Sequence, residues 1–373
     1  MRWLNDDQDR FLPGILAVAQ QAASIYPNRP SSWLRLAALL SRSGDFEAAL
    51  KVLAEAVNRI PGDLQLDLAL AHAHRSLHQH EKAIEITEKV LRRYPNDRSA
   101  SLLNRHLLLD MENKKPWHEQ QNSLTALLSA CDSILVDSPG HTDATYYKAK
   151  VLAGLGRNSD ACSVLALDRH VSITDLPPPP GYQDGEAFRQ VLADEIHNNP
   201  TLEPDPRRKA TRGGLQTAML WQPNAVAVRA LLEQIKSAIN DYVANLSSND
   251  ETGFSIARPR CAQLNSWAVI YGSEGHQKSH RHPSGWLSGV FYVVAPRKDG
   301  ETAYRGPLIL GALDPKADGI DPPWRTKTVE PVPGRLVLFP SYVPHASEST
   351  GVAGARISVA FDVVRVADNS VED

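Results

Sequence analysis

The stretch HQKSHRHPSGWLSGVFYVVAP, His276–Pro296, decides what the second half of this chain can be. It has three histidines within seven residues, followed by an apolar run ending in Tyr-Val-Val. A strand places residues i and i+2 on one face, so an extended SHRHP segment directs His280 and His282 to the same side. Imidazoles packed this closely are costly to bury unless something binds them. The stretch therefore predicts a metal-binding strand followed by a buried strand.

Short β-rich runs separated by Gly, Pro and Asp turns extend from 255 to 366, a spacing typical of a sandwich or jelly roll. A further histidine, His345, lies in LFPSYVPHASEST, after a predicted strand and at a turn. Two ligands at i and i+2 plus a distant histidine match a facial metal site, which leaves three positions open on a six-coordinate iron.

An arginine and a serine follow the last histidine in the run ARISVAF. Arg356 and Ser358 share a strand face, and arginine is the side chain best suited to hold a carboxylate through two hydrogen bonds. Next to a metal triad, this pair predicts a carboxylate cosubstrate that chelates the metal.

The segment from Asn265 to Val364 resembles the iron(II)- and 2-oxoglutarate-dependent oxygenases. YGSEGHQKSHRH is similar to the lead-in of the prolyl-hydroxylase-like enzymes. HRHPSGWLSGVFYVVAP and FPSYVPHAS…RISVAF are closer to a bacterial and phage subgroup with an H-x-H-P…SGV-Y-Y pattern and a later FPS…H…R-I-S. The resemblance implies a double-stranded β-helix, the cofactors Fe(II), 2-oxoglutarate and O2, and hydroxylation of an unactivated C–H bond.

The resemblance also assigns roles to particular side chains. The expected catalytic iron ligands are His280, His282 and His345. The residues expected to bind 2-oxoglutarate or line its pocket are Arg356, Ser358, Tyr271 and Asn265. In this assignment Arg356 pairs with the distal carboxylate, helped by Ser358 and by the hydroxyl of Tyr271.

One position departs from the family pattern. Most members have Asp or Glu at the second ligand position, where this chain has His282. Three interpretations are open: His282 is a ligand in an all-nitrogen triad, it lies behind a two-histidine site, or the iron chemistry has been lost. A neutral third ligand leaves the site one negative charge poorer, which weakens iron retention.

The N-terminal half repeats itself with a period of 34 residues. Prolines at 27, 61 and 95 mark the period, and small residues align across it, such as Ala49 with Ala83. The pattern resembles the tetratricopeptide repeat over roughly residues 15 to 170, with a fourth unit from Pro139. Such units bury their apolar faces only by stacking. They either hold a peptide, protein or carrier-bound substrate in a groove, or serve only as a scaffold or dimer contact.

A run of four prolines in ITDLPPPPGY, residues 173–182, ends the repeats, because proline cannot continue a helix. The expected domains are therefore a repeat domain at 1–172, a proline-rich linker at 173–182 that acts as a spacer or a strap, and an oxygenase domain at 183–373. Amphipathic helical patterns such as RALLEQIKSAINDYVANL flank the strands. The predicted fold class is α + β multidomain, an α-helical tetratricopeptide-repeat solenoid followed by a jelly roll with flanking helices.

Composition narrows the partners. The chain has 373 residues and a net charge of −3, from 40 basic and 43 acidic residues, which gives no reason to expect nucleic acid or a membrane surface as a partner. Its three cysteines are far apart, which favours a reducing compartment, and no segment has the length of a membrane span. A cytoplasmic location is the simplest expectation.

Two rival functions stay open. A repeat adaptor whose oxygenase-like domain is degenerate and only binds would share these patterns. A cupin dioxygenase that does not use 2-oxoglutarate would also begin with H-x-H, but it needs a Glu shortly afterwards, where this chain has PSGWLSG.

Overall fold

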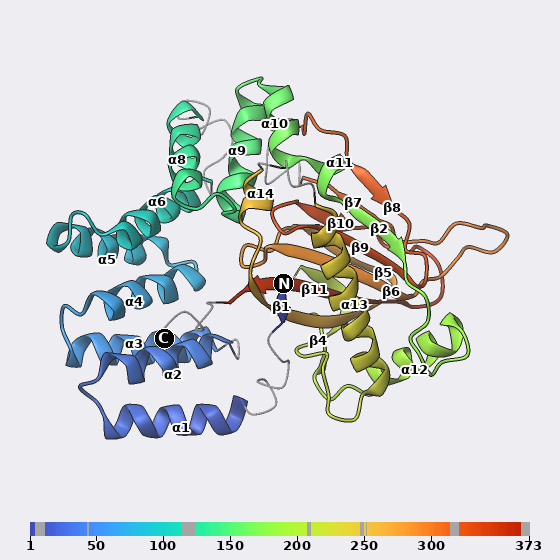
Figure 1. The fold of residues 1–373 in the computed structure, drawn as a ribbon, viewed down its shortest axis with the longest axis horizontal. Coiled ribbons are helices and arrows are strands. Elements are labelled where there is room, and N and C mark those ends of the chain that lie inside the picture. The colour runs from blue at the N-terminus through green and yellow to red at the C-terminus, as the bar shows by residue number, and fades with distance from the viewer. Residues whose placement is uncertain are drawn as a thin grey trace. The chain divides into compact units, whose positions relative to one another are not determined.

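The computed structural model describes residues 1–3, 12–42, 45–113, 124–206, 210–246, 250, 252–313 and 321–366. The chain divides into two compact units, one formed by Asn5–Asp137 and one by Met1–Leu4 together with Ser138–Asp373. The first is all helical, and the second is built around a curled sheet (Figure 1).

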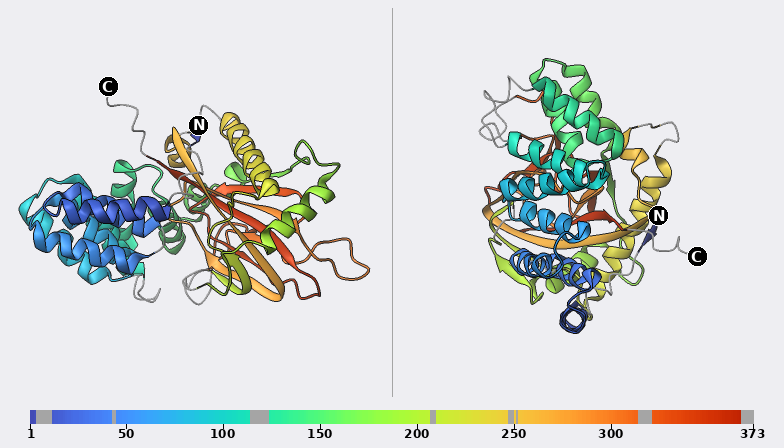
Figure 2. Two further views of the ribbon diagram at one scale, coloured as in Figure 1. Left: turned by 90° about the horizontal axis from the view of Figure 1, so that it is seen from below. Right: turned by 90° about the vertical axis from the view of Figure 1, so that its left-hand side faces the viewer.

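The helical unit contains successive antiparallel helices that stack side by side, as Figure 2 shows. They are α1 (Leu12–Ile25), α2 (Pro30–Arg42), α3 (Phe46–Arg59), α4 (Leu64–Ser76), α5 (His80–Arg93), α6 (Arg98–Asn113) and α8 (Leu124–Asp137).

The 34-residue period reappears in the helix contacts and caps. Ala49 and Ala83, which align across one period, are both completely buried, so neighbouring helices approach closely at these positions. Asp63 and Asp97 each lie two residues after a repeat proline. Each side chain accepts a hydrogen bond from the backbone N–H three residues on, at 3.0 and 2.7 Å, and so caps the next helix. The predicted repeat solenoid is confirmed.

The second unit has a largely antiparallel sheet with the strand order β2-β9-β6-β11-β5-β10-β7-β8, and β1 and β4 also pair with β5. Its strands are β1 (Arg2–Trp3), β2 (Ser172–Asp175), β3 (Leu202–Pro204), β4 (Thr211–Thr217), β5 (Cys261–His280), β6 (Leu287–Val294), β7 (Leu308–Leu310), β8 (Lys327–Val329), β9 (Arg335–Pro340), β10 (His345–Ser347) and β11 (Arg356–Arg365). Its helices are α9 (Thr142–Gly154), α10 (Asn158–Leu165), α11 (Leu167–His170), α12 (Gly185–His197), α13 (Val226–Asn245) and α14 (Gly253–Ile256).

Long central strands form the core of this unit. β11 pairs with β5 from Arg356 opposite Tyr271 to Arg365 opposite Ala262, and β6 covers the other edge of β11. Figure 1 shows α13 lying across the sheet, and its buried face is apolar at helical spacing. The predicted jelly-roll class with flanking helices is confirmed.

The segment between the helical repeats and the jelly roll lies on the sheet. β2 forms an edge strand against β9, the N–H of Leu176 donates to Gly334 O at 2.9 Å, and Gln234 Nε2 donates to Pro177 O at 2.9 Å. The segment that leads into the proline run is therefore fixed by hydrogen bonds to β9, to Gly334 and to Gln234 of α13. Helices α9 and α10, which follow the repeat pattern, belong to the compact unit that contains the sheet. The predicted domain limits of 1–172, 173–182 and 183–373 stay a prediction.

Candidate active site

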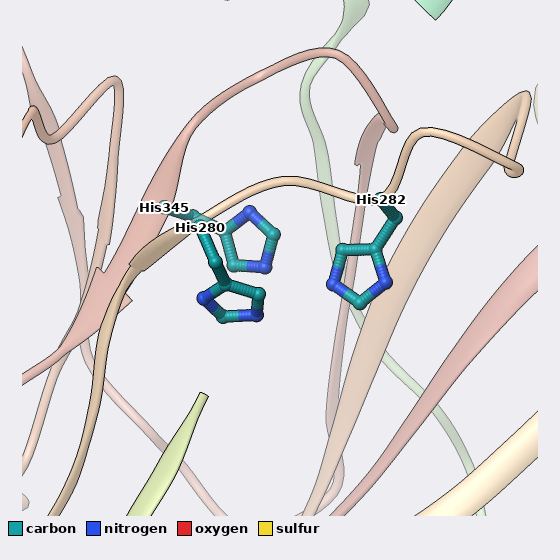
Figure 3. A group of neighbouring side chains, drawn as sticks. All are labelled: His280, His282 and His345. Carbon is teal, nitrogen blue, oxygen red and sulfur yellow. The ribbon is translucent and has the colours of Figure 1, made fainter. Parts of the chain in front are cut away.

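Three histidines, two from neighbouring strands and one from the loop after β5, meet at one end of the sheet. His280 is the last residue of β5, His345 is the first of β10, and these two lie opposite each other in the antiparallel pair. His282 follows two residues after His280. The ring centroids are 4.2 Å apart for His280 and His345, and 5.1 Å apart for each pair that includes His282. Figure 3 shows the three rings gathered around one space.

Each ring uses Nδ1 for a hydrogen bond to an oxygen atom. His280 Nδ1 lies 2.8 Å from Lys278 O, and His345 Nδ1 lies 3.0 Å from Val343 O. His282 Nδ1 lies 2.8 Å from Asp362 Oδ2. A carbonyl or a carboxylate can only accept, so each Nδ1 carries a proton, and in the neutral ring Nε2 then keeps its lone pair.

His280 and His345 are held in the neutral form, which is the form that binds metal. Burial, followed by the neighbouring His282, lowers the pKa of His280 to about 4. Burial also lowers the pKa of His345 well below its usual range. One potential ligand atom from each of the three histidines lies within 4.8 Å of the other two, and they are the group that the described residues offer for a metal. Three imidazoles whose Nδ1 atoms are already engaged, leaving Nε2 to coordinate, fit a divalent transition metal.

A buried cation lies in the same pocket. Arg356, at the start of β11, is 2% exposed. Its guanidinium donates to Gly306 O, to Glu348 O at 3.1 Å and to Ser347 Oγ at 2.9 Å. Its Nε has no hydrogen-bond partner, and no ion pair joins Arg356 to a carboxylate in the described part of the chain. A buried charge without a counterion is costly, so this guanidinium is suited to an anionic ligand.

The other predicted cosubstrate residues lie at different depths. The Tyr271 ring lies beneath Arg356, 4.7 Å from ring centroid to guanidinium carbon, and burial raises its pKa to about 12, so the hydroxyl stays a donor. That hydroxyl donates to Thr211 Oγ1 at 3.3 Å. Ser358 lines the pocket with Arg356, whereas Asn265 is exposed and is not among the lining residues. The roles of these residues stay predictions.

The pocket also contains side chains besides the expected metal ligands and cosubstrate residues. Those with polar atoms are Gln277, Ser288, Tyr292 and Ser347, and apolar walls come from Trp267, Val269, Leu308 and Phe339. Burial raises the pKa of Tyr292 to about 12, so it too presents a neutral hydroxyl. Tyr292 lies two residues after Val290, another lining residue of β6. This alternation along β6 is the feature of the sequence that could have predicted Tyr292 as a pocket residue.

Helix α9 contacts the loop that carries His282, at Arg281 and at Gly285. Arg281 Nε donates to Asp143 Oδ1 at 2.9 Å, and Arg281 Nη2 donates to Tyr147 OH at 2.6 Å. The guanidinium also lies over the rings of Tyr146 and Tyr147, at 4.3 and 4.7 Å. Thr142 Oγ1 donates to Gly285 O at 2.9 Å, which fixes the far end of the loop.

Two family matches cover separate parts of the chain. Residues 265–362 match a family described as "Putative 2OG-Fe(II) oxygenase", and residues 40–105 match the tetratricopeptide repeat family. No curated protein matches the chain. Within the described residues, no helix has the length and apolar character needed to cross a membrane.

Several solved structures are similar in part. A prolyl-4-hydroxylase from Pseudomonas putida is 20% identical, with a TM-score of 0.36 over 57% of this chain and 99% of that one. HygX from Streptomyces hygroscopicus, solved with nickel and 2-oxoglutarate, is 12% identical, with a TM-score of 0.36 over 54% of this chain and 85% of that one. A thermophilic tetratricopeptide-repeat protein from Thermus thermophilus is 21% identical, with a TM-score of 0.30 over 37% of this chain and 73% of that one.

The family matches agree with the helical repeats and with the sheet that carries the histidines. This chain combines tetratricopeptide repeats with a domain of the 2OG-Fe(II) oxygenase family, whose cofactors are Fe(II) and 2-oxoglutarate.

Proposed function

We propose that this protein is an Fe(II)- and 2-oxoglutarate-dependent dioxygenase that hydroxylates an unactivated C–H bond. One observation carries the proposal. A single pocket holds three histidines whose Nδ1 atoms are engaged and a buried Arg356 that no carboxylate of the described chain neutralises.

The histidines supply the metal site in this proposal. His280, His282 and His345 present Nε2, because their Nδ1 atoms are engaged. With Fe(II) and 2-oxoglutarate bound, such a site couples O2 reduction and oxidative decarboxylation of the 2-oxoacid to oxidation of the substrate. A facial triad leaves room for cosubstrate, oxygen and substrate approach.

Arg356 sets the orientation of the cosubstrate. Its free Nε and its planar guanidinium suit a carboxylate, and the hydroxyls of Ser358 and Tyr292 line the same pocket. The Tyr271 ring supports the guanidinium from below. The apolar walls exclude water, which strengthens each of these charge-assisted hydrogen bonds.

We assign the substrate to a peptidyl, protein or carrier-bound class. The repeats support this choice, because stacked repeats of this kind form extended concave binding surfaces. The metal pocket itself offers no further indication of the substrate.

An anaerobic titration tests the proposal. Metal-free protein receives Fe(II) and then 2-oxoglutarate, and the visible charge-transfer band of the chelate is followed. The band should saturate in the wild type and be absent in Arg356→Ala at the same concentration. Arg365→Ala is the matched control, because Arg365 lies exposed at the far end of the same strand.

The outcomes separate the rival functions. A band followed by succinate release establishes the enzyme and justifies a substrate screen. Iron binding without a 2-oxoglutarate band would favour a cupin-like dioxygenase. No iron binding by folded protein would favour a repeat adaptor with a degenerate oxygenase-like domain.

A further inference from the structure

Asp362 contacts the metal-site histidine that stands where a carboxylate ligand is usual. Its Oδ2 lies 2.8 Å from His282 Nδ1, and the two side chains are 13% and 16% exposed. Asp362 comes from β11, opposite Asn265 on β5 and opposite Ser288 on β6. It is not part of the His280, His282 and His345 group, so its carboxylate lies behind the ring.

The contact differs in kind from those of the other two histidines. His280 and His345 each donate to a neutral backbone carbonyl two residues earlier in the chain. His282 donates to an anionic side chain that lies 80 residues away in sequence. The carbonyl contacts are made within the same short segment of chain, whereas the Asp362 contact requires a particular residue on another strand.

A second hydrogen bond fixes the carboxylate itself. Ser288 Oγ lies 2.6 Å from Asp362 Oδ1 and 2.8 Å from Ser341 Oγ. A carboxylate can only accept, so Ser288 donates to Asp362 and accepts from Ser341. The His282 ring is held from other sides as well, since it stacks on Trp267 at 5.6 Å and its backbone N–H donates to Ser341 O at 3.1 Å.

The carboxylate of Asp362 would offset the positive charge of a bound metal. Three neutral imidazoles leave the full charge of a divalent cation in a buried pocket that already holds the Arg356 guanidinium. A carboxylate that accepts from Nδ1 makes the imidazole a more basic ligand and brings a negative charge near the metal. We propose that Asp362, acting through His282, supplies the negative charge that a direct carboxylate ligand would otherwise bring, so that this all-histidine site retains Fe(II). Asp362 is thus a positioning residue, and its role rests on the proposed metal site.

Metal affinity in the absence of 2-oxoglutarate tests the role directly. Metal-free wild type, Asp362→Asn and His282→Ala are titrated with Co(II), followed by its visible absorption, and with Fe(II) under anaerobic conditions. Asp362→Asn keeps the shape but removes the charge, and its metal Kd should rise about 10- to 100-fold. His282→Ala should weaken binding at least as much. Asp175→Asn is the matched control, because Asp175 pairs with Arg335 on the exposed edge of the sheet.

A second measurement does not depend on any variant folding. Imidazole ¹⁵N spectra of metal-free wild type should show His282 protonated on Nδ1, with Nε2 unprotonated. The opposite tautomer would overturn the proposal.

The remaining outcomes separate the two proposals. Wild-type affinity in Asp362→Asn, with a loss in His282→Ala, would refute the role of Asp362 and leave the metal site intact. Wild-type affinity in both variants would remove His282 from the ligand set and refute the role of Asp362. No metal binding by the wild type would overturn the proposed function and this inference together.

Discussion

Arg281, in the loop between β5 and β6, forms an ion pair with Asp143 of helix α9, with Nε and Oδ1 2.9 Å apart. The arginine is the residue between His280 and His282, so its ion pair with the helix fixes the backbone between two of the expected ligands. Arg281 is 23% and Asp143 8% exposed at the side chain, which makes this a largely desolvated ion pair.

Removal of one partner should be costly. Arg281→Met removes the Arg281 cation from the buried Asp143 carboxylate, and the free energy of unfolding should fall by about 3 kcal/mol. Urea denaturation followed by fluorescence measures the loss. The double variant Arg281→Met with Asp143→Asn should be less destabilised than Arg281→Met alone, because position 143 then carries no buried charge. Equal stability of Arg281→Met and the wild type would contradict the importance of the pair.

Arg356→Lys should separate cosubstrate binding from metal binding. Lysine keeps the charge but lacks the planar fork, so binding of 2-oxoglutarate should weaken by roughly 2–3 kcal/mol. This corresponds to about a 30- to 150-fold higher Kd, measurable by calorimetry with Co(II) present. Metal affinity without 2-oxoglutarate should stay unchanged, because the three histidines are intact. A parallel loss of metal affinity would show that Arg356 instead maintains the fold of the pocket.

Two glycines of β5 form a matched pair around Tyr271. A Cβ at Gly275 would lie 2.4 Å from Tyr271 Cδ1 and 2.7 Å from Gly213 O, whereas a Cβ at Gly272 meets nothing within 4 Å. Gly275→Ala should therefore displace Tyr271 from beneath Arg356 and weaken 2-oxoglutarate binding. Gly272→Ala should leave binding unchanged. Similar calorimetric Kd values for both variants would mean that Tyr271 does not support the cosubstrate pocket.

The buried pair of His170 and Asp250 predicts how stability depends on pH. Burial lowers the pKa of His170, and the hydrogen bond from His170 to Asp250, 2.7 Å long, helps to lower the pKa of Asp250 against the effect of its own burial. Below pH 6.5 the unfolded chain takes up a proton at His170 that the folded chain does not, so stability falls as the pH falls. Asp250 adds a further loss below pH 3.8.

Urea unfolding of the metal-free protein at several pH values measures this slope. His170→Asn should be less stable at pH 7.5 but should show a flatter dependence just below the ordinary histidine range, by up to about 1.4 kcal/mol per pH unit. The same slope in the variant and the wild type would assign the acid sensitivity to other groups.

Much of the architecture could be predicted because its signals are local in sequence. The repeat period recurs in prolines and in small residues such as Ala49 and Ala83, which are buried where neighbouring helices pack. Strand alternation predicts that His280 and His282 share a face, and their rings lie 5.1 Å apart although β5 itself ends at His280. Asn265 follows the same alternation with Trp267. Alternation predicts which face of the strand a residue is on but not whether it is buried, and Asn265 is exposed.

The residues that were missed depend on strand register, which the sequence does not reveal. Asp362 reaches His282 because β11 pairs in one register with β5 and β6. A shift of one residue would turn it to the opposite face. Likewise, the repeat pattern of α9 did not predict that its Asp143 would pair with Arg281 in the loop after β5.

The pairing of β1 with β5 joins the first residues of the chain to a strand far along it. Arg2 lies opposite Cys261, and its N–H donates to Arg260 O at 2.8 Å. The helices of Asn5–Asp137 intervene, and their contacts are local enough to form while later segments are still being synthesised. Strand β1 can pair only after β5 has left the ribosome, so this pairing closes a loop that contains the whole helical unit.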